Sequence, residues 1–209
     1  LQRATYTWPA AVRVYPTVLY ASQAGSNQAP YNSWAKAATN IQTAVDYAYT
    51  PATATVRLWV ASGTYTLAGR LDIGKALLVE SASGPSATIL RRPTTDRAVF
   101  LAHARAVLSG FTVQDCAKGG VELQLGTVTN CHIINNAANY VYGGGISVSG
   151  GLLVRSRIAN NSNTPNDWGP GGGIWLSGGV VQDCVITNNM NSGGYWYSTC
   201  AGGGVYLSG

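Results

Sequence analysis

Acidic side chains are the residues of this sequence best suited to chemistry, and there are few of them. The 209 residues include eight Asp and Glu, two His and four Cys. Two carboxylates roughly 5–10 Å apart form the acid/base pair that hydrolyses glycosidic bonds, and a group of carboxylates binds calcium. Asp72, Glu80 and Asp96 lie in an irregular stretch of the sequence, so a pair among them stays open.

The cysteines do not indicate metal chemistry. They stand at positions 116, 131, 184 and 200, which contain no Cys-x-x-Cys pair and no Cys/His spacing typical of zinc. We therefore expect neither a metal nor a cofactor.

Two sequence motifs, called the first and second phrase below, repeat along the second half of the chain. Their spacing indicates how the side chains are positioned. The first reads GGGISVSGG from residue 143, GGGIWLSGG from 171 and GGGVYLSG from 202. The second occupies residues 108–116, 128–136, 153–161 and 181–189, so it recurs after 20, 25 and 28 residues. Only the connection between the second phrase and the glycines varies in length. This pattern predicts a solenoid of short parallel strands, with the right-handed crossovers that such strands adopt.

Alignment of the second phrase predicts columns of like residues, stacked at about 4.8 Å. We expect the asparagines to form a hydrogen-bonded ladder inside a turn. Cys131 and Cys184 would be core residues two coils apart, too distant for a disulfide. The columns are Leu108/Val128/Leu153/Val181, Phe111/Cys131/Ser156/Cys184, Val113/Ile133/Ile158/Ile186 and Asp115/Asn135/Asn160/Asn188.

The same alignment argues against catalysis in the regular coils. Glu122 stands alone in its outward column, and Asp183 follows Arg155 in a salt-bridge arrangement. His132 falls beside Arg157 without a carboxylate to orient it, which makes a poor general base. We predict that the chain has no catalytic carboxylate pair.

The N-terminal part predicts a helix and less regular strands. Ser33 is expected to cap a helix running to about Tyr49, because apolar residues recur at spacings of four and three and Thr50-Pro51 follows. This helix would cover the first coil as a lid. Strand composition marks residues 55–65, 71–81, 87–90 and 98–101. The predicted organisation is an extended segment and capping helix over 1–50, then coils over 51–209 that are incomplete at the C-terminal end.

The sequence resembles a known group of proteins. PYNSWAKAATNIQTAVDYA from Pro30, TVRLWVASGTYTL from Thr55 and LSGFTV from Leu108 are similar to the N-terminal half of secreted bacterial right-handed parallel β-helix proteins of the pectin-lyase-like superfamily. The glycine-rich coils resemble polymorphic-outer-membrane-protein repeats. The resemblance covers residues from about 17 to 209 and implies an all-β, right-handed parallel β-helix with a short N-terminal capping helix. It implies no single activity, since the superfamily includes lyases, glycoside hydrolases, adhesins and structural shafts.

Aromatic residues form the candidate binding site. The variable connections leave the same corner of successive coils, so their rings would gather on one flank beside outward residues of the glycine-rich strands. Such rings suit contacts with sugars or proteins; alternatively, they fold back onto their own coils. The candidate residues are Tyr140, Tyr142, Trp168, Trp175, Tyr195, Trp196, Tyr197 and Tyr206.

These features predict an extracellular or cell-surface structural or adhesive solenoid protein that binds a glycan or a surface protein through the aromatic flank. The alternative is a polysaccharide lyase or glycoside hydrolase acting on an acidic polysaccharide. The net charge of +5 includes no basic run, which argues against nucleic acid. No apolar run approaches the ~20 residues of a membrane span.

The end of the sequence leads to one further expectation. Residues 202–209 begin a coil whose next strand does not follow. We expect either that the natural protein continues or that copies associate head to tail into a filament. In the second case, residues 5–20 would add to the open strand edge.

Overall fold

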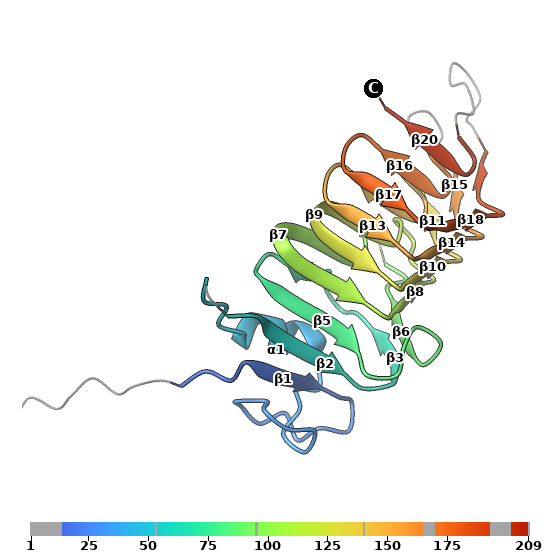
Figure 1. Cartoon of the computed structure of the whole chain (residues 1–209). Coiled ribbons are helices and arrows are strands. Elements are labelled where there is room, and N and C mark those ends of the chain that lie inside the picture. The colour runs from blue at the N-terminus through green and yellow to red at the C-terminus, as the bar shows by residue number, and fades with distance from the viewer. Residues whose placement is uncertain are drawn as a thin grey trace, which may run out of the picture.

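The computed structural model describes residues 14–52, 54–94, 96–139, 141–164, 170–192 and 202–208. Short parallel strands are stacked into a solenoid of about five turns, seen in Figure 1 as a rod that runs from β1 to β20. Strands make up 44% of the structure and helix 4%. The predicted parallel β-helix with one short helix is confirmed. Among the described residues, no helix is long and apolar enough to cross a membrane.

Three faces surround the core, and each face collects strands from successive turns. The first comprises β1 (Val18–Ala21), β2 (Val56–Val60), β5 (Leu77–Ser81), the second halves of β7 (Val99–Ser109) and β9 (Val121–Thr129), β13 (Leu152–Val154) and β17 (Val180–Gln182). The second comprises β3 (Gly63–Thr66), β6 (Thr88–Arg91), β8 (Thr112–Gln114), β10 (His132–Ile134), β14 (Arg157–Ala159) and β18 (Val185–Thr187).

The third face carries the outward column discussed below. It comprises β4 (Leu71–Ile73), the first halves of β7 and β9, β12 (Ile146–Val148), β16 (Ile174–Leu176) and β20 (Val205–Leu207). Because β7 and β9 run through the corner between the first and third faces, hydrogen bonding joins these faces into one sheet.

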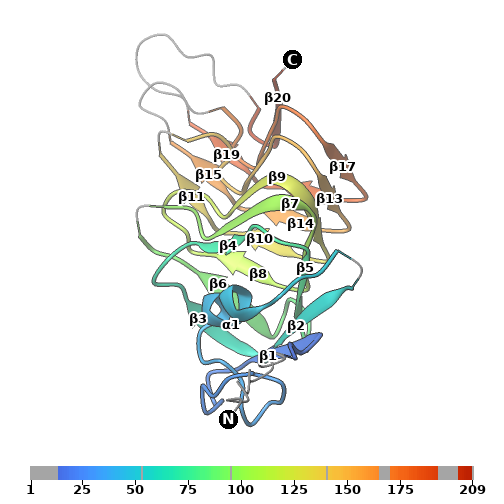
Figure 2. The ribbon, with the colours of Figure 1, turned by 90° about the vertical axis from the view of Figure 1, so that its left-hand side faces the viewer.

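The variable connections begin with regular structure that the sequence did not indicate. A small parallel sheet follows the asparagine pairs, and it comprises β11 (Ala137–Ala138), β15 (Ser162–Asn163) and β19 (Met190–Asn191). Figure 2 shows these strands on one side of the rod, opposite β2, β5, β13 and β17.

Strand register confirms the predicted columns of apolar residues. Leu108, Val128, Leu153 and Val181 are direct neighbours on the first face, as are Val113, Ile133, Ile158 and Ile186 on the second. The cysteines of the described part, Cys116, Cys131 and Cys184, are free, and Cys131 is completely buried. The repeat therefore positions side chains as its period predicts.

The asparagine ladder is present, but in a different column from the one aligned above. Asp115, Asn135, Asn160 and Asn188 turn the corner with φ of 55, 54, 54 and 53°, a left-handed conformation that Asn and Asp tolerate. The next residue in each coil points inward and forms the ladder. Asn136 Nδ2 donates to Asn161 Oδ1 at 3.0 Å, and Asn161 Nδ2 donates to Asn189 Oδ1 at 2.9 Å.

The helix is shorter than predicted. α1 spans Ile41–Tyr47, and Asn40 caps it by accepting from the Gln42 amide at 2.8 Å. Ser33 does not begin the helix, because the backbone that follows pairs with β1. The Ala38 N–H donates to the Tyr20 carbonyl at 3.0 Å, and the Ala38 carbonyl accepts from Ser22 at 2.9 Å. These groups are therefore not available for helical hydrogen bonds.

α1 and the segment around Ala38 cover different edges of the first turn. α1 lies where another strand of the third face would lie, and the Gln42 side chain replaces that strand. Its Oε1 accepts from the Asp72 amide at 2.8 Å and its Nε2 donates to the Asp72 carbonyl at 3.4 Å. Ile41, Ala44 and Val45 of α1 are buried in the core shared with the coils. The predicted lid is thus formed by α1 together with the segment around Ala38.

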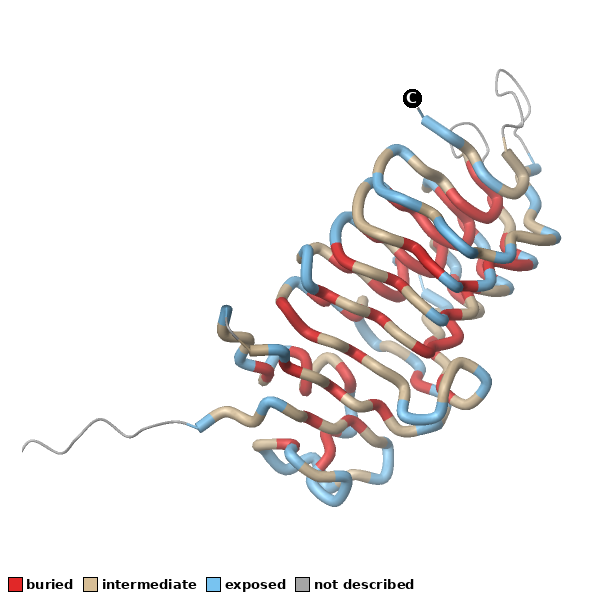
Figure 3. The backbone as a smooth tube through the Cα atoms, viewed as in Figure 1, coloured by how far each residue is buried: buried red, intermediate tan, exposed pale blue. Residues whose placement is uncertain are grey.

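The opposite end of the rod exposes apolar side chains. Figure 3 shows buried positions in every middle turn and mostly intermediate or exposed positions in the last. Val205, the strand neighbour of the buried Ile174, is 36% exposed, because no described segment covers this turn. Other apolar residues there are also exposed, namely Val180, Val185, Met190 and Leu207.

Candidate binding face

An unbroken column of outward side chains runs along the third face. Each member pairs in register with the next, so neighbours are about 4.8 Å apart along the axis. From α1 towards the other end, the column is Asp72, Phe100, Glu122, Ser147, Trp175 and Tyr206. Acidic residues therefore occupy one end of the column and aromatic residues the other.

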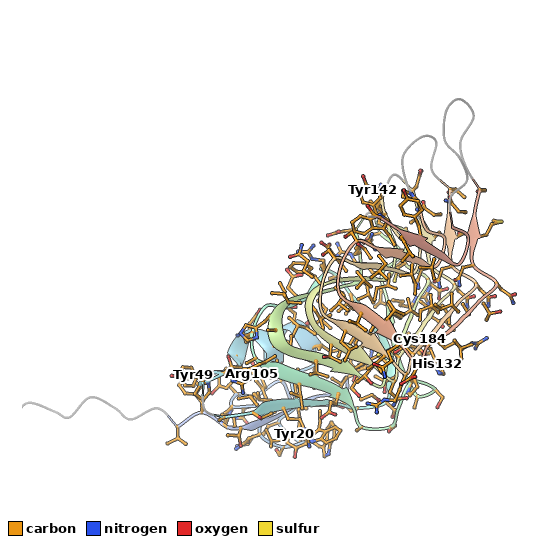
Figure 4. The ribbon with its side chains drawn as sticks, turned by 45° about the horizontal axis from the view of Figure 1, so that its top comes forward. Tyr20, Tyr49, Arg105, His132, Tyr142 and Cys184 are labelled. Carbon is orange, nitrogen blue, oxygen red and sulfur yellow. The ribbon has the colours of Figure 1, made fainter. Side chains whose placement is uncertain are left out.

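The aromatic end contains a stacked pair of rings. Tyr142 and Trp175 have centroids 4.8 Å apart and an interplanar angle of 18°. Tyr142 is 48% exposed, so Trp175 supports one face of its ring while the other remains accessible. Tyr206 is the strand neighbour of Trp175. Figure 4 shows Tyr142 near the C-terminal end of the solenoid, far from Tyr20 and Tyr49.

The glycine that follows Tyr142 explains how the stack is built. Gly143 has φ of 71°, and a Cβ at this position would lie 2.2 Å from the Ile146 carbonyl oxygen. Only glycine allows both this conformation and this close approach. The glycine triplet thus turns the chain sharply enough for the Tyr142 ring to stack on Trp175, in β16 of the next coil.

Arg97 holds the same segment from inside the molecule. Its guanidinium is buried and donates to the carbonyl of Tyr142, and also to those of Gly143 at 3.3 Å and Val121 at 3.1 Å. Burial lowers the pKa of Arg97 to about 10, which leaves the group charged at neutral pH. Gly119 provides the space, since a Cβ there would lie 2.6 Å from Arg97 Nη1.

Arg70 links the carboxylates at the other end of the column. Its Nε lies 2.5 Å from Asp72 Oδ1, its Nη1 lies 3.8 Å from Glu122 Oε2, and its guanidinium covers the Phe100 ring at 4.3 Å from the centroid. The hydrogen bond to Asp72 raises the pKa of Arg70. The expectation that Glu122 stands alone was wrong, because Phe100 and Arg70 come from coils that the repeat alignment did not include.

The three acidic residues left open by the sequence lie in different places. Asp72 belongs to the column, whereas Glu80 forms an ion pair with Arg57 at 2.7 Å on the first face. Asp96 lies before β7, where it accepts from the Arg97 amide at 2.8 Å. Asp72 and Glu122 therefore form the closest approach to a carboxylate pair on this face, and Arg70 lies between them. Within the described ranges, no three His, Cys, Asp or Glu side chains gather as a metal site.

Two predicted charge contacts have different outcomes. His132 lies beside Arg157 as expected, and burial, followed by the charge of Arg157, lowers the pKa of His132. Arg155 does not bind Asp183 in the described structure; its Nη2 donates instead to Thr129 Oγ1 at 3.4 Å. Arg155 and Asp183 both lie at corners with a left-handed backbone, with φ of 48 and 51°. The column alignment assumed extended strand residues, so it did not describe the directions of these two side chains.

The structure brings together three of the predicted aromatic site residues, Tyr142, Trp175 and Tyr206. The other five, Tyr140, Trp168, Tyr195, Trp196 and Tyr197, lie outside the described residues. Sequence reasoning missed Arg70, Arg97 and Phe100. A signal for Arg70 existed, because residues two apart in an extended chain point to the same side and Arg70 comes two residues before Asp72.

A second aromatic group lies at the N-terminal end of the first face. The Tyr20 and Trp34 rings meet edge to face at 4.6 Å, and Trp59 is the strand neighbour of Tyr20. Arg57 lies 5.0 Å from the centroid of the Trp59 ring. Trp34 holds the segment that covers β1, so this group has a structural role at that end of the solenoid.

No family model matches the sequence, and neither a curated protein nor a solved structure matches the chain.

Proposed function

We propose that this chain is a non-catalytic binding solenoid of the cell surface or extracellular space, and that its third face holds a glycan. The observation that carries the proposal is the Tyr142 ring, supported from behind by Trp175 and exposed on its other side. A rigid, half-exposed aromatic ring offers a large apolar face at low entropic cost. Tyr206, the partly exposed strand neighbour of Trp175, provides a hydroxyl group on the same face.

The charges along the column favour a neutral glycan over an acidic one. Arg70, a cation beside the column, already contacts the carboxylates of Asp72 and Glu122. A uronate would have to compete with both, and would approach a site that carries more acidic than basic side chains. The whole chain has a net charge of +5, but this face has the opposite balance of charge.

The enzyme alternative has one observation in its favour, namely that Asp72 and Glu122 approach the same guanidinium. In a glycoside hydrolase, the space between the carboxylates holds the scissile bond and the attacking group. Here both carboxylates contact the Arg70 guanidinium. The pair is better suited to shaping and holding the face than to acid/base chemistry.

Binding to a panel of polysaccharides tests the proposal. Affinity electrophoresis with neutral glucans, mannans and xylans and with polygalacturonate should show retardation by at least one neutral polymer. Tyr142→Ala should weaken this binding about tenfold, the loss expected for one stacking contact of ~1.4 kcal/mol.

Tyr49→Ala is the matched control. Tyr49 is 56% exposed and stacks on Tyr15 at 4.8 Å, at the other end of the rod. Its replacement should leave binding unchanged. Equal losses in the two variants, or binding to polygalacturonate alone, would contradict the proposal.

End-to-end association remains a second proposal, supported by the exposed apolar residues of the last turn, among them Val185 and Leu207. The described part of the N-terminal segment argues against the predicted route. β1 pairs with β2 of its own chain, and Tyr20 and Ser22 bond to Tyr31 and Ala38 on the other side. Sedimentation of wild type and Val185→Lys over a concentration series tests association through the last turn, which the lysine should abolish.

A further inference from the structure

A polar groove lies at the end of the third face, between α1 and the connection from β3 to β4. Its volume is about 320 Å³, at the lower limit of the range of small-molecule sites, roughly 300–1,000 Å³. Asn40, Thr43 and Asp46 line it from the helix side, and Thr66 and Arg70 from the strand side.

Several hydrogen-bonding groups in the groove have no internal partner. In the part of the chain that the structure describes, the hydroxyls of Thr43 and Thr66 and the side-chain NH2 of Asn40 form no hydrogen bond. Asp46 accepts from Gln42 through Oδ1 at 2.7 Å, which leaves Oδ2 available. Donors and acceptors are thus mixed, with no concentration of one charge, as the hydroxyl groups of a sugar require.

Arg70 lies next to both the groove and the column. It lines the groove and also contacts Asp72 and Glu122, the acidic members of the column. Beyond Asp72 the column cannot continue, because Gln42 of α1 occupies the edge of β4. A linear ligand that lies along the column from Tyr206 therefore meets α1 and enters the groove beside it.

We infer that the groove receives the terminal sugar of a neutral glycan whose following residues lie along the third face. This inference rests on the proposed function and deepens it, because it states where on the face the end of the glycan lies. The column alone would bind a polysaccharide at any internal position. The groove selects a chain end.

The test fills the groove without changing the core. Thr66 is exposed, so Thr66→Trp should fold and block the groove. Thr64→Trp is the matched control, because Thr64 is an exposed threonine of the same strand that does not line the groove. Thr43→Val removes a hydroxyl at nearly constant volume and provides a second groove variant.

Isothermal titration with cellohexaose, mannohexaose and xylohexaose measures the outcome. For a hexasaccharide that binds wild type, Thr66→Trp should raise Kd at least tenfold and Thr43→Val severalfold, with Thr64→Trp unchanged. Binding of long hydroxyethylcellulose, which has few ends, should be insensitive to all three if the glucan is the ligand.

The result separates this inference from the proposed function. If Tyr142→Ala loses hexasaccharide binding and Thr66→Trp does not, the groove inference is overturned and the proposed function stands. If Thr66→Trp loses binding and Tyr142→Ala does not, the groove is a site on its own and the proposed face is wrong. Absence of binding by all three oligosaccharides and by the polysaccharide panel overturns both.

Discussion

The guanidinium of Arg97 donates to the main-chain carbonyl of Tyr142, 45 residues later in the sequence. This contact joins the inside of the solenoid to its proposed binding face. Arg97 is buried, and the acceptors around it are carbonyl groups of Val121, Tyr142 and Gly143. The position of the exposed ring is thus determined by a charge in the interior.

Arg97→Met should therefore lower the free energy of unfolding by about 3 kcal/mol, because buried carbonyls lose their donor at ~1–3 kcal/mol each. Urea denaturation followed by tryptophan fluorescence measures the change. Arg105→Met is the control, since Arg105 also donates to two carbonyls, of Ala52 at 2.8 Å and Ala54 at 3.3 Å, but at the surface. Its cost should stay below about 1 kcal/mol. A similar loss of unfolding free energy in both variants would show that the buried contacts of Arg97 stabilise the fold no more than the surface contacts of Arg105.

Substitutions in the two columns of asparagine should have different effects on stability. Asn161→Ala removes the acceptor of the Asn136 amide and side chain and the donor to Ile133, all inside the turn. We expect a loss of about 2–4 kcal/mol. Asn160→Gly changes the exposed neighbour, whose φ is 54°, and should be neutral or slightly stabilising. Thermal unfolding of the two variants gives the comparison, and a larger loss at Asn160 would contradict the assigned ladder.

The pH dependence of stability should contain a contribution from His132. Its pKa is lowered in the folded state by burial and by Arg157, so the unfolded chain takes up a proton more readily. Stability is then lost as pH falls through about 6.5. His132→Gln should flatten urea-unfolding stability between about pH 5 and 7, and Arg157→Gln should flatten it only in part, because burial is the larger cause. An unchanged slope in His132→Gln would show that this side chain does not contribute.

The carboxylates beside Arg70 should have no catalytic role. Wild type is expected to release no reducing ends or unsaturated products from the polysaccharide panel, because Arg70 lies between Asp72 and Glu122. The matching variants are Asp72→Asn and Glu122→Gln. Turnover by wild type that either variant abolishes would transfer the assignment to the enzyme alternative.

The regular coils could be predicted from the sequence because their information is local. Strand residues alternate with a period of two, and the second phrase has constant length, so a residue such as Ile133 meets Ile158 whatever the loops do. The same repeat predicted that Tyr142, Trp175 and Tyr206 lie on one flank. Their proposed binding role stays a prediction.

Choices between adjacent residues required the tertiary structure. Asn135 and Asn136 have the same chemistry, and only the left-handed corner at the first directs the second inward. The helix start was misplaced for a similar reason: Ala38 pairs with Tyr20 in β1, a contact between segments that no local propensity expresses.

Spacings within one repeat were enough to predict the solenoid, its register and the shared flank of Tyr142, Trp175 and Tyr206. The tertiary structure decided the pairing of Arg70 with Glu122, the burial of Arg97 under Tyr142 and the groove against α1. Each of these joins an irregular early coil to a distant segment. Such contacts depend on how many residues each early turn contains and on where α1 replaces a strand, and neither is set by the repeat.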